Sequence, residues 1–286
     1  MPELRIGTCS WKYESWRGIV YSGTAGRNFL AEYAKKFRTV EVDQWFWSLH
    51  GPGRVTLPDP SAVSDYASSV PADFRFSIKV PDSVTLTHFR KKEKADALVP
   101  NPHFLSHELF SDFLGRIKPL GKTAGPLIFQ FEYLNRLKMP SQKAFQESFG
   151  AFIRECPPGY LYCVEIRNPN YLNAEFFSFL EANGLYPVFL QGYYMPPVFD
   201  IYAKHAERIH GLAVIRLHGP DRLGIEERTG GSWDRITDPK DGELERIAGM
   251  VRGLLGRDVS VTLNVNNHYE GSAPLTIEKL GRLLQD

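Results

Sequence analysis

The sequence predicts an α/β protein with a TIM-barrel-like (β/α)8 fold that forms one domain over residues 1–286. Short apolar segments with the alternation of strands recur along the chain, and segments with helical periodicity separate them. The length of 286 residues is ordinary for such a barrel, and no linker rich in proline, glycine or serine divides the chain. An open, doubly wound sheet is the alternative, but no glycine-rich phosphate loop follows the first strand.

The predicted strands and helices alternate along the chain. The eight strands cover residues 4–9, 39–46, 74–80, 127–132, 162–167, 186–191, 212–218 and 260–267. Helices are predicted between them at about 27–37, 60–69, 104–120, 142–154, 174–183, 240–256 and 273–284. The connection at 193–210 has only a weak helical pattern, so we expect the barrel to be irregular there.

Composition and charge narrow the class of protein. Hydrophobic residues make up 43% and charged residues 23%, which suits a large core and not a disordered chain. The net charge of +1 argues against binding of duplex DNA through bulk charge, although a local basic groove stays open. Three cysteines without metal-type spacing are typical of a reducing compartment, so we expect a cytoplasmic protein. We expect no membrane contact and no signal peptide.

Six of the predicted strands carry apolar residues on one face and polar residues on the other. At 261–264, for example, Val261 and Leu263 alternate with Thr262 and Asn264. In a barrel the apolar face packs on the helices, and the polar face points inward and reaches the usual active-site mouth at the C-terminal strand ends. The predicted pocket is lined by Glu41, Lys79, Gln130, Glu165, Arg167, Arg216, His218 and Asn266.

Glu165 and Glu41 are the predicted catalytic carboxylates. Desolvation in a closed pocket raises the pKa of a carboxyl group, which suits proton transfer near neutral pH. Two carboxylates across a barrel mouth would also suit glycoside hydrolysis. The alternative is a structural ion pair of Glu165 with Arg216 or Arg167, because buried charges are normally paired.

Arg216 and His218 lie two residues apart on one strand face. Arginine offers a planar fork for phosphate or carboxylate, so Arg216 is predicted to hold an anion together with Arg167 and Lys79. His218 is then the second proton carrier, and the alternative is a hydrogen-bonded core histidine.

Amide side chains are predicted to bind substrate hydroxyls or an oxyanion. Gln130, Asn266 and Asn267 are the candidates. For Asn267 the alternative is a turn that caps the last helix, with Gly271 at the bend and Ser272 as the cap.

The long loops supply the remaining candidates. Trp11, Trp16 and Trp45 crowd the first two loops, where they either bind ring faces or pack the loops on the barrel. His88 is predicted to reach the mouth from loop 82–103, and the basic run at 90–94 is either a lid over the mouth or a solvated surface.

No metal site or cofactor is predicted. The histidines His88, His218 and His268 lie on different segments, and the chain has no His-x-His or paired-cysteine motif. A site assembled from His and Glu side chains of different loops is the alternative.

Seven segments together resemble the YecE-like family, a domain of unknown function. They are "IGTCSWKYESWRGIVYSG" (6–23), "FRTVEVDQWFW" (37–47), 74–88, "GPLIFQF" (125–131), "VEIRNPNY" (164–171), "IRLHG" (215–219) and "VNNHYEGSAP" (265–274). The resemblance runs in order over nearly the whole chain. It implies a TIM-barrel-like fold and a bacterial, cytoplasmic protein, but it implies no particular reaction.

The chain departs from the family pattern at four places. Relatives usually have Asn-Ser-Thr-Phe-Tyr where this chain has Asp43 to Trp47, two prolines where it has Glu132 and Tyr133, histidine in place of Asn168, and aspartate in place of Gln191. These differences imply a substrate other than that of typical relatives, or reduced activity.

The pattern predicts a hydrolase or lyase that acts on a small phosphorylated or polyhydroxylated substrate. The first alternative is a protein that binds or processes nucleic acid with the same cationic mouth and the basic loop. The second alternative is a non-catalytic barrel, which would be marked by a mouth closed by internal Glu–Arg pairs.

Overall fold

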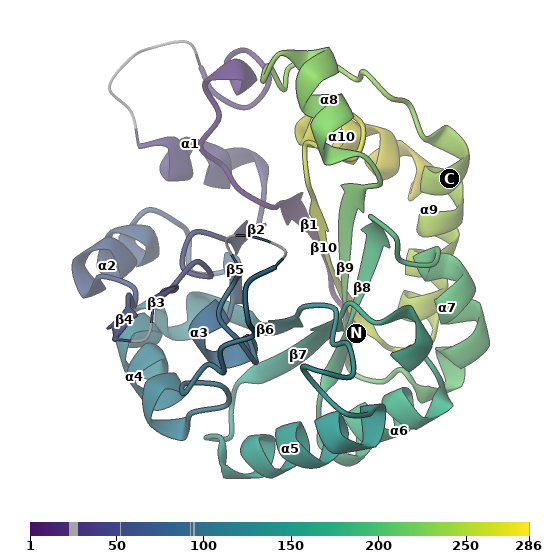
Figure 1. Cartoon of the computed structure of the whole chain (residues 1–286). Coiled ribbons are helices and arrows are strands. Elements are labelled where there is room, and N and C mark those ends of the chain that lie inside the picture. Colours follow the sequence, from purple (N-terminus) through teal and green to yellow (C-terminus); the bar gives the residue numbers. More distant parts are fainter. Residues whose placement is uncertain (23–27, 52, 92, 94, 286) are drawn as a thin grey trace.

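The structure, a computed structural model, describes residues 1–22, 28–51, 53–91, 93 and 95–285. Eight parallel strands close into a barrel in the order β1-β10-β9-β8-β7-β6-β5-β2, which confirms the predicted fold (Figure 1). The barrel strands are β1 (Leu4–Thr8), β2 (Thr39–Val42), β5 (Arg75–Lys79), β6 (Ala124–Phe131), β7 (Leu161–Ile166), β8 (Tyr186–Gly192), β9 (Leu212–Gly219) and β10 (Ser260–Val265).

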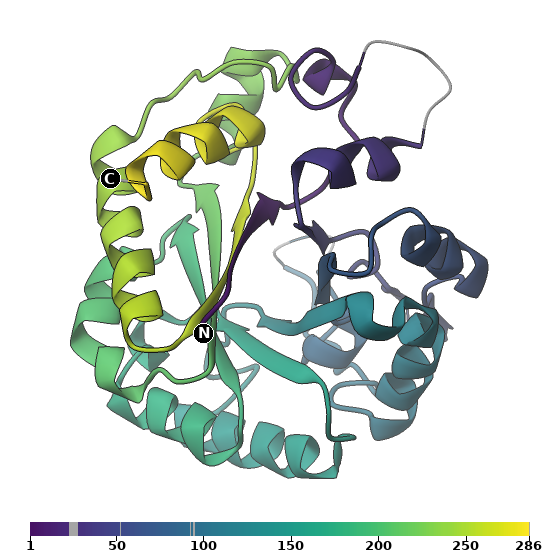
Figure 2. The same ribbon diagram turned by 180° about the vertical axis from the view of Figure 1, so that it is seen from behind.

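Helices surround the barrel on its outside, as Figures 1 and 2 show from opposite sides. They are α1 (Phe29–Lys36), α2 (Pro60–Ser68), α3 (Asp82–Thr85), α4 (His107–Ile117), α5 (Gln142–Glu155), α6 (Ala174–Ala182), α7 (Val198–His205), α8 (Arg222–Thr229), α9 (Asp241–Gly256) and α10 (Ala273–Leu283). Within the described residues, none of them is both long and apolar enough to cross a membrane.

Three parts of the fold go beyond the sequence prediction. The helices α3 and α8 and a short hairpin of β3 (Leu49–Gly51) and β4 (Arg54–Val55) lie in segments that were predicted as loops. The connection after β8 contains α7, which has eight residues. The pairing of β8 with β9 shifts between Gln191 and Gly192, so the barrel is irregular near this strand end, as expected. Residue 27, the first of the predicted helix at about 27–37, lies outside the described residues.

The interior of the barrel has an apolar floor and a charged upper layer. Ile128, Cys163, Val188, Leu212 and Val214 form a small core of their own, separate from the main core between strands and helices. The residues that alternate with these five along the same strands point outward and belong to the main core. The alternation read from the sequence is therefore confirmed, and the same alternation places polar side chains above the floor.

The first strand lies very close to its neighbour in the barrel. A Cβ atom on Gly7 would lie 2.0 Å from the carbonyl oxygen of Thr39, far inside van der Waals contact. Glycine is therefore required at this position, and the close approach brings the residue after β1, Cys9, near the second strand.

Candidate active site

A cavity of about 410 Å³ opens at the C-terminal ends of the barrel strands. Seven of the eight residues predicted to line a pocket do line it: Glu41, Lys79, Gln130, Arg167, Arg216, His218 and Asn266. The eighth, Glu165, is completely buried and is not part of the wall. The lining also includes Cys9, Tyr13, Asp43, Phe46, Trp47, Tyr193 and Arg222.

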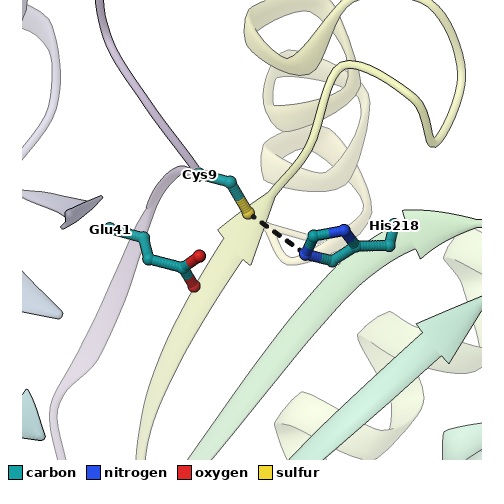
Figure 3. Close-up of side chains that lie close together, drawn as sticks. All are labelled: Cys9, Glu41 and His218. Carbon is teal, nitrogen blue, oxygen red and sulfur yellow. Dashed lines mark hydrogen bonds between the residues drawn. The ribbon is translucent and has the colours of Figure 1, made fainter. Parts of the chain in front are cut away.

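Three side chains, two from strands β2 and β9 and one from the residue after β1, converge on one side of this cavity (Figure 3). The Sγ atom of Cys9 lies 3.7 Å from Nε2 of His218. One ligand-type atom of each of Cys9, Glu41 and His218 lies within 4.8 Å of the other two, and all three residues are buried. A thiol, a carboxylate and an imidazole are thus brought together from distant parts of the sequence.

The second ring nitrogen of His218 faces Tyr193. The Tyr193 hydroxyl lies 3.3 Å from Nδ1, which holds the ring with Nε2 toward Cys9. Burial, with Arg216 and Arg167 nearby, lowers the pKa of His218 well below its ordinary value, so the imidazole is neutral at pH 7. Tyr193 itself has a φ of 52°, a left-handed conformation that is costly for a bulky residue and that occurs mostly at functional sites.

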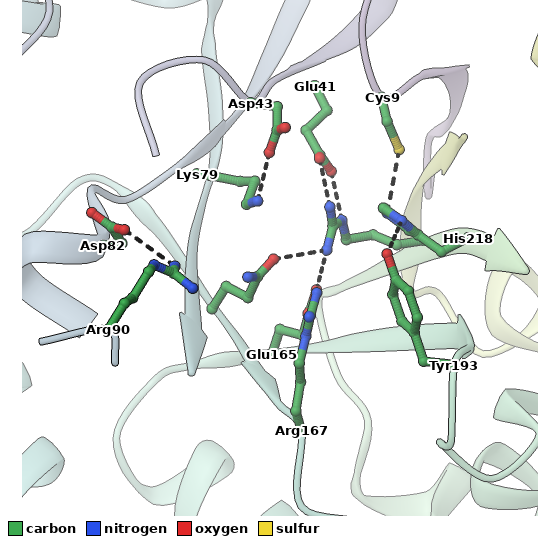
Figure 4. A network of polar contacts seen from close by, with 12 residues as sticks. Cys9, Glu41, Asp43, Lys79, Asp82, Arg90, Glu165, Arg167, Tyr193 and His218 are labelled. Atoms are coloured by element: carbon green, nitrogen blue, oxygen red, sulfur yellow. Dashed lines mark hydrogen bonds and ion pairs between the residues drawn. The ribbon is translucent and has the colours of Figure 1, made fainter. Parts of the chain in front are cut away.

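The guanidinium of Arg216 is the centre of a buried network, and Figure 4 labels its partners Glu41 and Glu165. It donates to both carboxylate oxygens of Glu41, with Nε and Nη2 each 2.7 Å from an oxygen. Its Nη1 donates to Glu165 and, at 3.2 Å, to the amide oxygen of Gln130. Four of the five N–H groups of Arg216 are thereby engaged inside the protein.

Glu165 lies between two arginines. Arg167 Nε donates to one of its oxygens at 2.9 Å, and Arg216 donates to the other. Burial alone would raise the pKa of Glu165, but Arg216, Arg167 and Lys79 outweigh it and lower the pKa to about 2. The side chain therefore stays ionised at neutral pH and matches the structural Glu–Arg pair that was the alternative to a catalytic role.

Glu41 has a different electrostatic environment. It is also fully buried, and burial raises the pKa of its carboxyl group against the opposing effect of Arg216. Lys79 donates to Asp43 at 2.5 Å and lies 3.8 Å from the centre of the Phe46 ring. The environments of Glu41 and Glu165 thus shift their pKa values in opposite directions, an arrangement that is typical of sites where one carboxyl group moves a proton.

Arg167 keeps part of its guanidinium directed at the cavity. Its side chain is 24% exposed, and its Nη atoms have no hydrogen-bond partner among the described residues. The guanidinium carbon lies 5.2 Å from the centre of the Tyr193 ring, which limits its movement. A planar pair of donors is available here, whereas the donors of Arg216 are almost all engaged.

The three predicted tryptophans do not line the cavity. Trp11 packs edge-on against Tyr66, and Trp45 stacks on the same ring. Trp16 is fully buried beside Tyr13. They pack the first two loops on the barrel, and the cavity wall receives Tyr13, Phe46, Trp47 and Tyr193 in their place.

Two further predicted residues lie outside the cavity wall. The Nδ1 atom of His88 lies 3.0 Å from the hydroxyl of Thr87, and Arg90 from the same loop reaches the cavity and pairs with Asp82.

The side-chain oxygen of Asn267, the second of these residues, accepts a hydrogen bond from the backbone N–H of Ala273 at the start of α10. Asn267 thus caps α10. Lys92 and Lys94, from the predicted basic run, lie outside the described residues.

The positions that depart from the family pattern divide into two groups. Asn168 accepts from the backbone N–H of Leu134 and donates to its carbonyl, and Gln191 accepts from the backbone of Val198 at the start of α7. Both stabilise loops behind the cavity. Asp43 and Trp47 line the cavity itself, so a changed ligand preference would arise from these two.

Sequence reasoning missed Cys9, Tyr193 and Arg222. Strand parity could have found Cys9, because it shares the inward face of the first strand with Arg5 and Gly7. Tyr193 and Arg222 follow the ends of β8 and β9 in connections without a clear pattern. Their side chains reach the cavity through loop conformation, which strand periodicity does not predict.

Comparison with known proteins agrees with this architecture. Residues 5–286 match the family described as protein of unknown function DUF72. The UPF0759 protein YecE of Escherichia coli is 27% identical over 170 residues, which is 59% of this chain and 50% of YecE. The chain thus spans about half the length of the curated relative that it matches.

Two solved structures have the same fold. A DUF72 family protein from Enterococcus faecalis superimposes with a TM-score of 0.67 at 18% identity, covering 99% of this chain and 96% of that one. A DUF72 family protein from Thermotoga maritima gives a TM-score of 0.65 at 22% identity, covering 99% of this chain and 100% of that one. From the match over nearly its whole length, the chain belongs to the DUF72 family, whose function is unknown.

Proposed function

We propose that the chain is an enzyme of the hydrolase or lyase type that binds a small phosphorylated or polyhydroxylated substrate in the mouth cavity. The observation that carries the proposal is the free fork of Arg167, which faces the same cavity as the neutral His218. A cavity of about 410 Å³ is within the range of small-molecule sites. We also propose a reducing, cytoplasmic location, because all three cysteines are free thiols.

The cationic side chains would have two different roles, binding of the substrate and positioning of the carboxylates. Arg167 would hold the anionic group of the substrate through its two Nη atoms, with Lys79 close to the same wall. Arg216 would act as a positioning residue, because its donors hold Glu41 and Glu165. This division modifies the prediction from the sequence, in which Arg216 was the main anion ligand.

Proton transfer would fall to the groups that face the cavity. His218 lines the wall with Nε2 directed inward, and Glu41 lines the same wall. Glu165 is ionised and shielded from the cavity, so it would stabilise Arg216 and Arg167 and would not carry a proton.

A second candidate, binding of nucleic acid, is favoured by the aromatic rim. Trp47 is 53% exposed beside the cavity, with Arg90 4.7 Å from the centre of its ring. Tyr133 and Tyr194, 50% and 60% exposed, form an edge-on pair with ring centres 6.3 Å apart. Exposed rings beside cationic groups can stack unpaired bases, so a longer ligand would use this rim.

A thermal-shift screen tests both candidates. The probes are a hexose phosphate, the free hexose, a mononucleotide and a short oligonucleotide. A ligand at 100 times its Kd should stabilise the protein by about 2.7 kcal/mol. We expect the hexose phosphate to stabilise the wild type and Arg116→Gln, which changes an exposed arginine on α4, but not Arg167→Gln.

Other outcomes discriminate between the candidates. A shift with the oligonucleotide that falls steeply with added salt would favour nucleic-acid binding. Equal shifts for the wild type and Arg167→Gln, or no shift with any probe, would contradict the anion-binding role of Arg167 and with it the proposed function.

A further inference from the structure

We propose that Cys9, Glu41 and His218 form a binding site for one zinc ion at the mouth of the barrel. The site deepens the proposed function and rests on it only for the chemistry that the ion would support. With the ion bound, Glu41 and His218 would act as its ligands, and the water on the ion would take over the proton transfer proposed for them. Binding itself is argued from geometry and ligand type. It can be measured without any enzymatic assay.

The geometry already has one edge of a zinc tetrahedron. Zn–S and Zn–N bonds of about 2.3 and 2.1 Å at the tetrahedral angle place sulfur and nitrogen about 3.6 Å apart. The Sγ–Nε2 separation between Cys9 and His218 is 3.7 Å. The ligand atoms of all three residues lie within 4.8 Å of one another, so a shift of the Glu41 carboxylate by no more than about 1.3 Å completes a three-ligand set.

The donor types select the metal. Thiolate and imidazole favour Zn²⁺ and similar transition-metal ions, whereas Mg²⁺ and Ca²⁺ prefer sets made of oxygen ligands. All three residues line the cavity, so a fourth coordination position would be open to water or substrate. Three protein ligands with one open position are the arrangement of catalytic zinc sites, in which the ion activates a bound water.

The neighbours of the three ligands are suited to support an ion. The Tyr193 hydroxyl lies 3.3 Å from Nδ1 of His218 and leaves Nε2 free to bind metal. Arg216 donates one hydrogen bond to each oxygen of Glu41, and each oxygen keeps a second lone pair. Arg216 would thus orient the carboxylate while one oxygen binds the ion.

A cation explains the cluster better than a nucleophilic cysteine would. Cys9 is only 6% exposed and lies beside the Glu41 carboxylate, which would repel a thiolate formed without a counter-ion. A dication attracts both the thiolate and the carboxylate, and it requires the imidazole to be neutral. Zinc binding would displace the Cys9 proton, and the three side chains would then offer one sulfur, one oxygen and one nitrogen donor at the same cavity.

Zinc binding to the metal-free chain of 286 residues tests the proposal. Competition with a zinc indicator should give one tightly bound ion per chain for the wild type and for Cys156→Ser, which changes a half-buried cysteine at the end of α5. Cys9→Ser and His218→Gln should weaken binding by more than about 100-fold, and Tyr193→Phe by about tenfold. With Co²⁺, a thiolate-to-metal absorption band should appear in the wild type and Cys156→Ser but not in Cys9→Ser.

Melting curves of the metal-free variants show whether each is folded, so a loss of zinc is not mistaken for unfolding. The proposal is overturned if the metal-free wild type takes up no zinc at micromolar concentration, or if Cys9→Ser binds it as tightly. Zinc binding without any anion binding would leave this site standing and contradict the proposed function. If an anion binds in a way that depends on Arg167 but the chain takes up no zinc, the proposed function would stand and the zinc site would be contradicted.

Discussion

Replacement of Arg216 by methionine should cost more stability than loss of any exposed arginine. The guanidinium is 1% exposed and neutralises two carboxylates, Glu41 and Glu165, that are 0% exposed. Removal of one partner from a buried ion pair costs about 3–5 kcal/mol, because the remaining charge is left unpaired in a medium of low dielectric. Domains are typically stable by about 5–15 kcal/mol, so Arg216→Met should remain folded with a small margin.

The assay is equilibrium unfolding in urea near pH 7.5 and near pH 5.5. In Arg216→Met the Glu41 carboxyl group loses its hydrogen-bond partner, whereas Glu165 keeps Arg167. The pKa of Glu41 should then lie above its value in the unfolded chain. Its protonation on folding is easier at low pH, so the deficit relative to the wild type should shrink at pH 5.5. Arg222→Met removes a cavity arginine whose side chain is 60% exposed, and should change stability by less than about 1 kcal/mol.

A triple variant separates pairing from packing. Changing Glu41 and Glu165 to glutamine together with Arg216→Met removes all three charges and should recover most of the lost stability. A loss below about 1 kcal/mol for Arg216→Met, or a deficit that is the same at both pH values, would refute the view that Arg216 is the centre of a structural network.

Three further outcomes are expected. Gly7→Ala should lower the free energy of unfolding in urea by at least about 1–3 kcal/mol, because the added Cβ would meet the Thr39 carbonyl. The control Gly115→Ala in α4, which has open space around it, should be neutral or stabilising. Equal effects of the two changes would contradict the close approach of β1 and β2. Asn168→Ala should lower stability by about 1–3 kcal/mol through the loss of both bonds to Leu134, and an unchanged melting temperature would show that these bonds do not form. The pKa of Glu165 is lowered to about 2 in the folded chain. The ionised carboxyl group therefore contributes roughly 3 kcal/mol to the free energy of unfolding above about pH 4.5, and this contribution is lost as the pH falls toward 2. Glu165→Gln should flatten this part of the plot of stability against pH, and an unchanged plot would contradict the pairing of Glu165 with the arginines.

The barrel could be predicted because its pattern is local. Val261 and Leu263 alternate with Thr262 and Asn264 within one strand, and the same alternation in six strands assigns an inside and an outside. The short elements were missed because they depend on tertiary contacts. Asp82, the first residue of α3, joins this helix to the hairpin of β3 and β4, because its carboxylate accepts from the backbone N–H groups of Ser48 and Leu49.

Many of the residues at the site could be predicted from the sequence, but their roles could not. Parity brought Glu41, Arg216 and His218 to one mouth, yet it does not show which donors are already engaged. Glu165 and Arg167 lie two residues apart on the same strand face, but they have different proposed roles. Glu165 is buried between cations, whereas Arg167 has free hydrogen-bond donors at the cavity. The spacing of Cys9 and His218 also could not predict that they meet, since 209 positions separate them and the closure of the barrel, where β1 pairs with β10, is what brings β1 near β9.

The balance of charge at the mouth links anion binding to metal binding. Arg216, Arg167 and Lys79 carry three positive charges, and Glu41, Glu165 and Asp43 carry three negative charges in direct contact with them. These six side chains together carry no net charge, so their attraction for a phosphate comes mainly from the free donors of Arg167. A zinc ion with the Cys9 thiolate would add one net positive charge beside the free donors of Arg167.

Zinc and phosphate should therefore bind with positive coupling. Binding linkage requires that each ligand raise the affinity of the other by the same factor, which we expect to be about 5- to 150-fold. Calorimetric titration of inorganic phosphate into the metal-free and zinc-loaded chain measures one side, and zinc competition with and without phosphate measures the other. Cys9→Ser should bind phosphate as weakly as the metal-free wild type, whether or not zinc is present. Equal phosphate affinity in the metal-free and zinc-loaded wild type would show that the two ligands do not share this mouth.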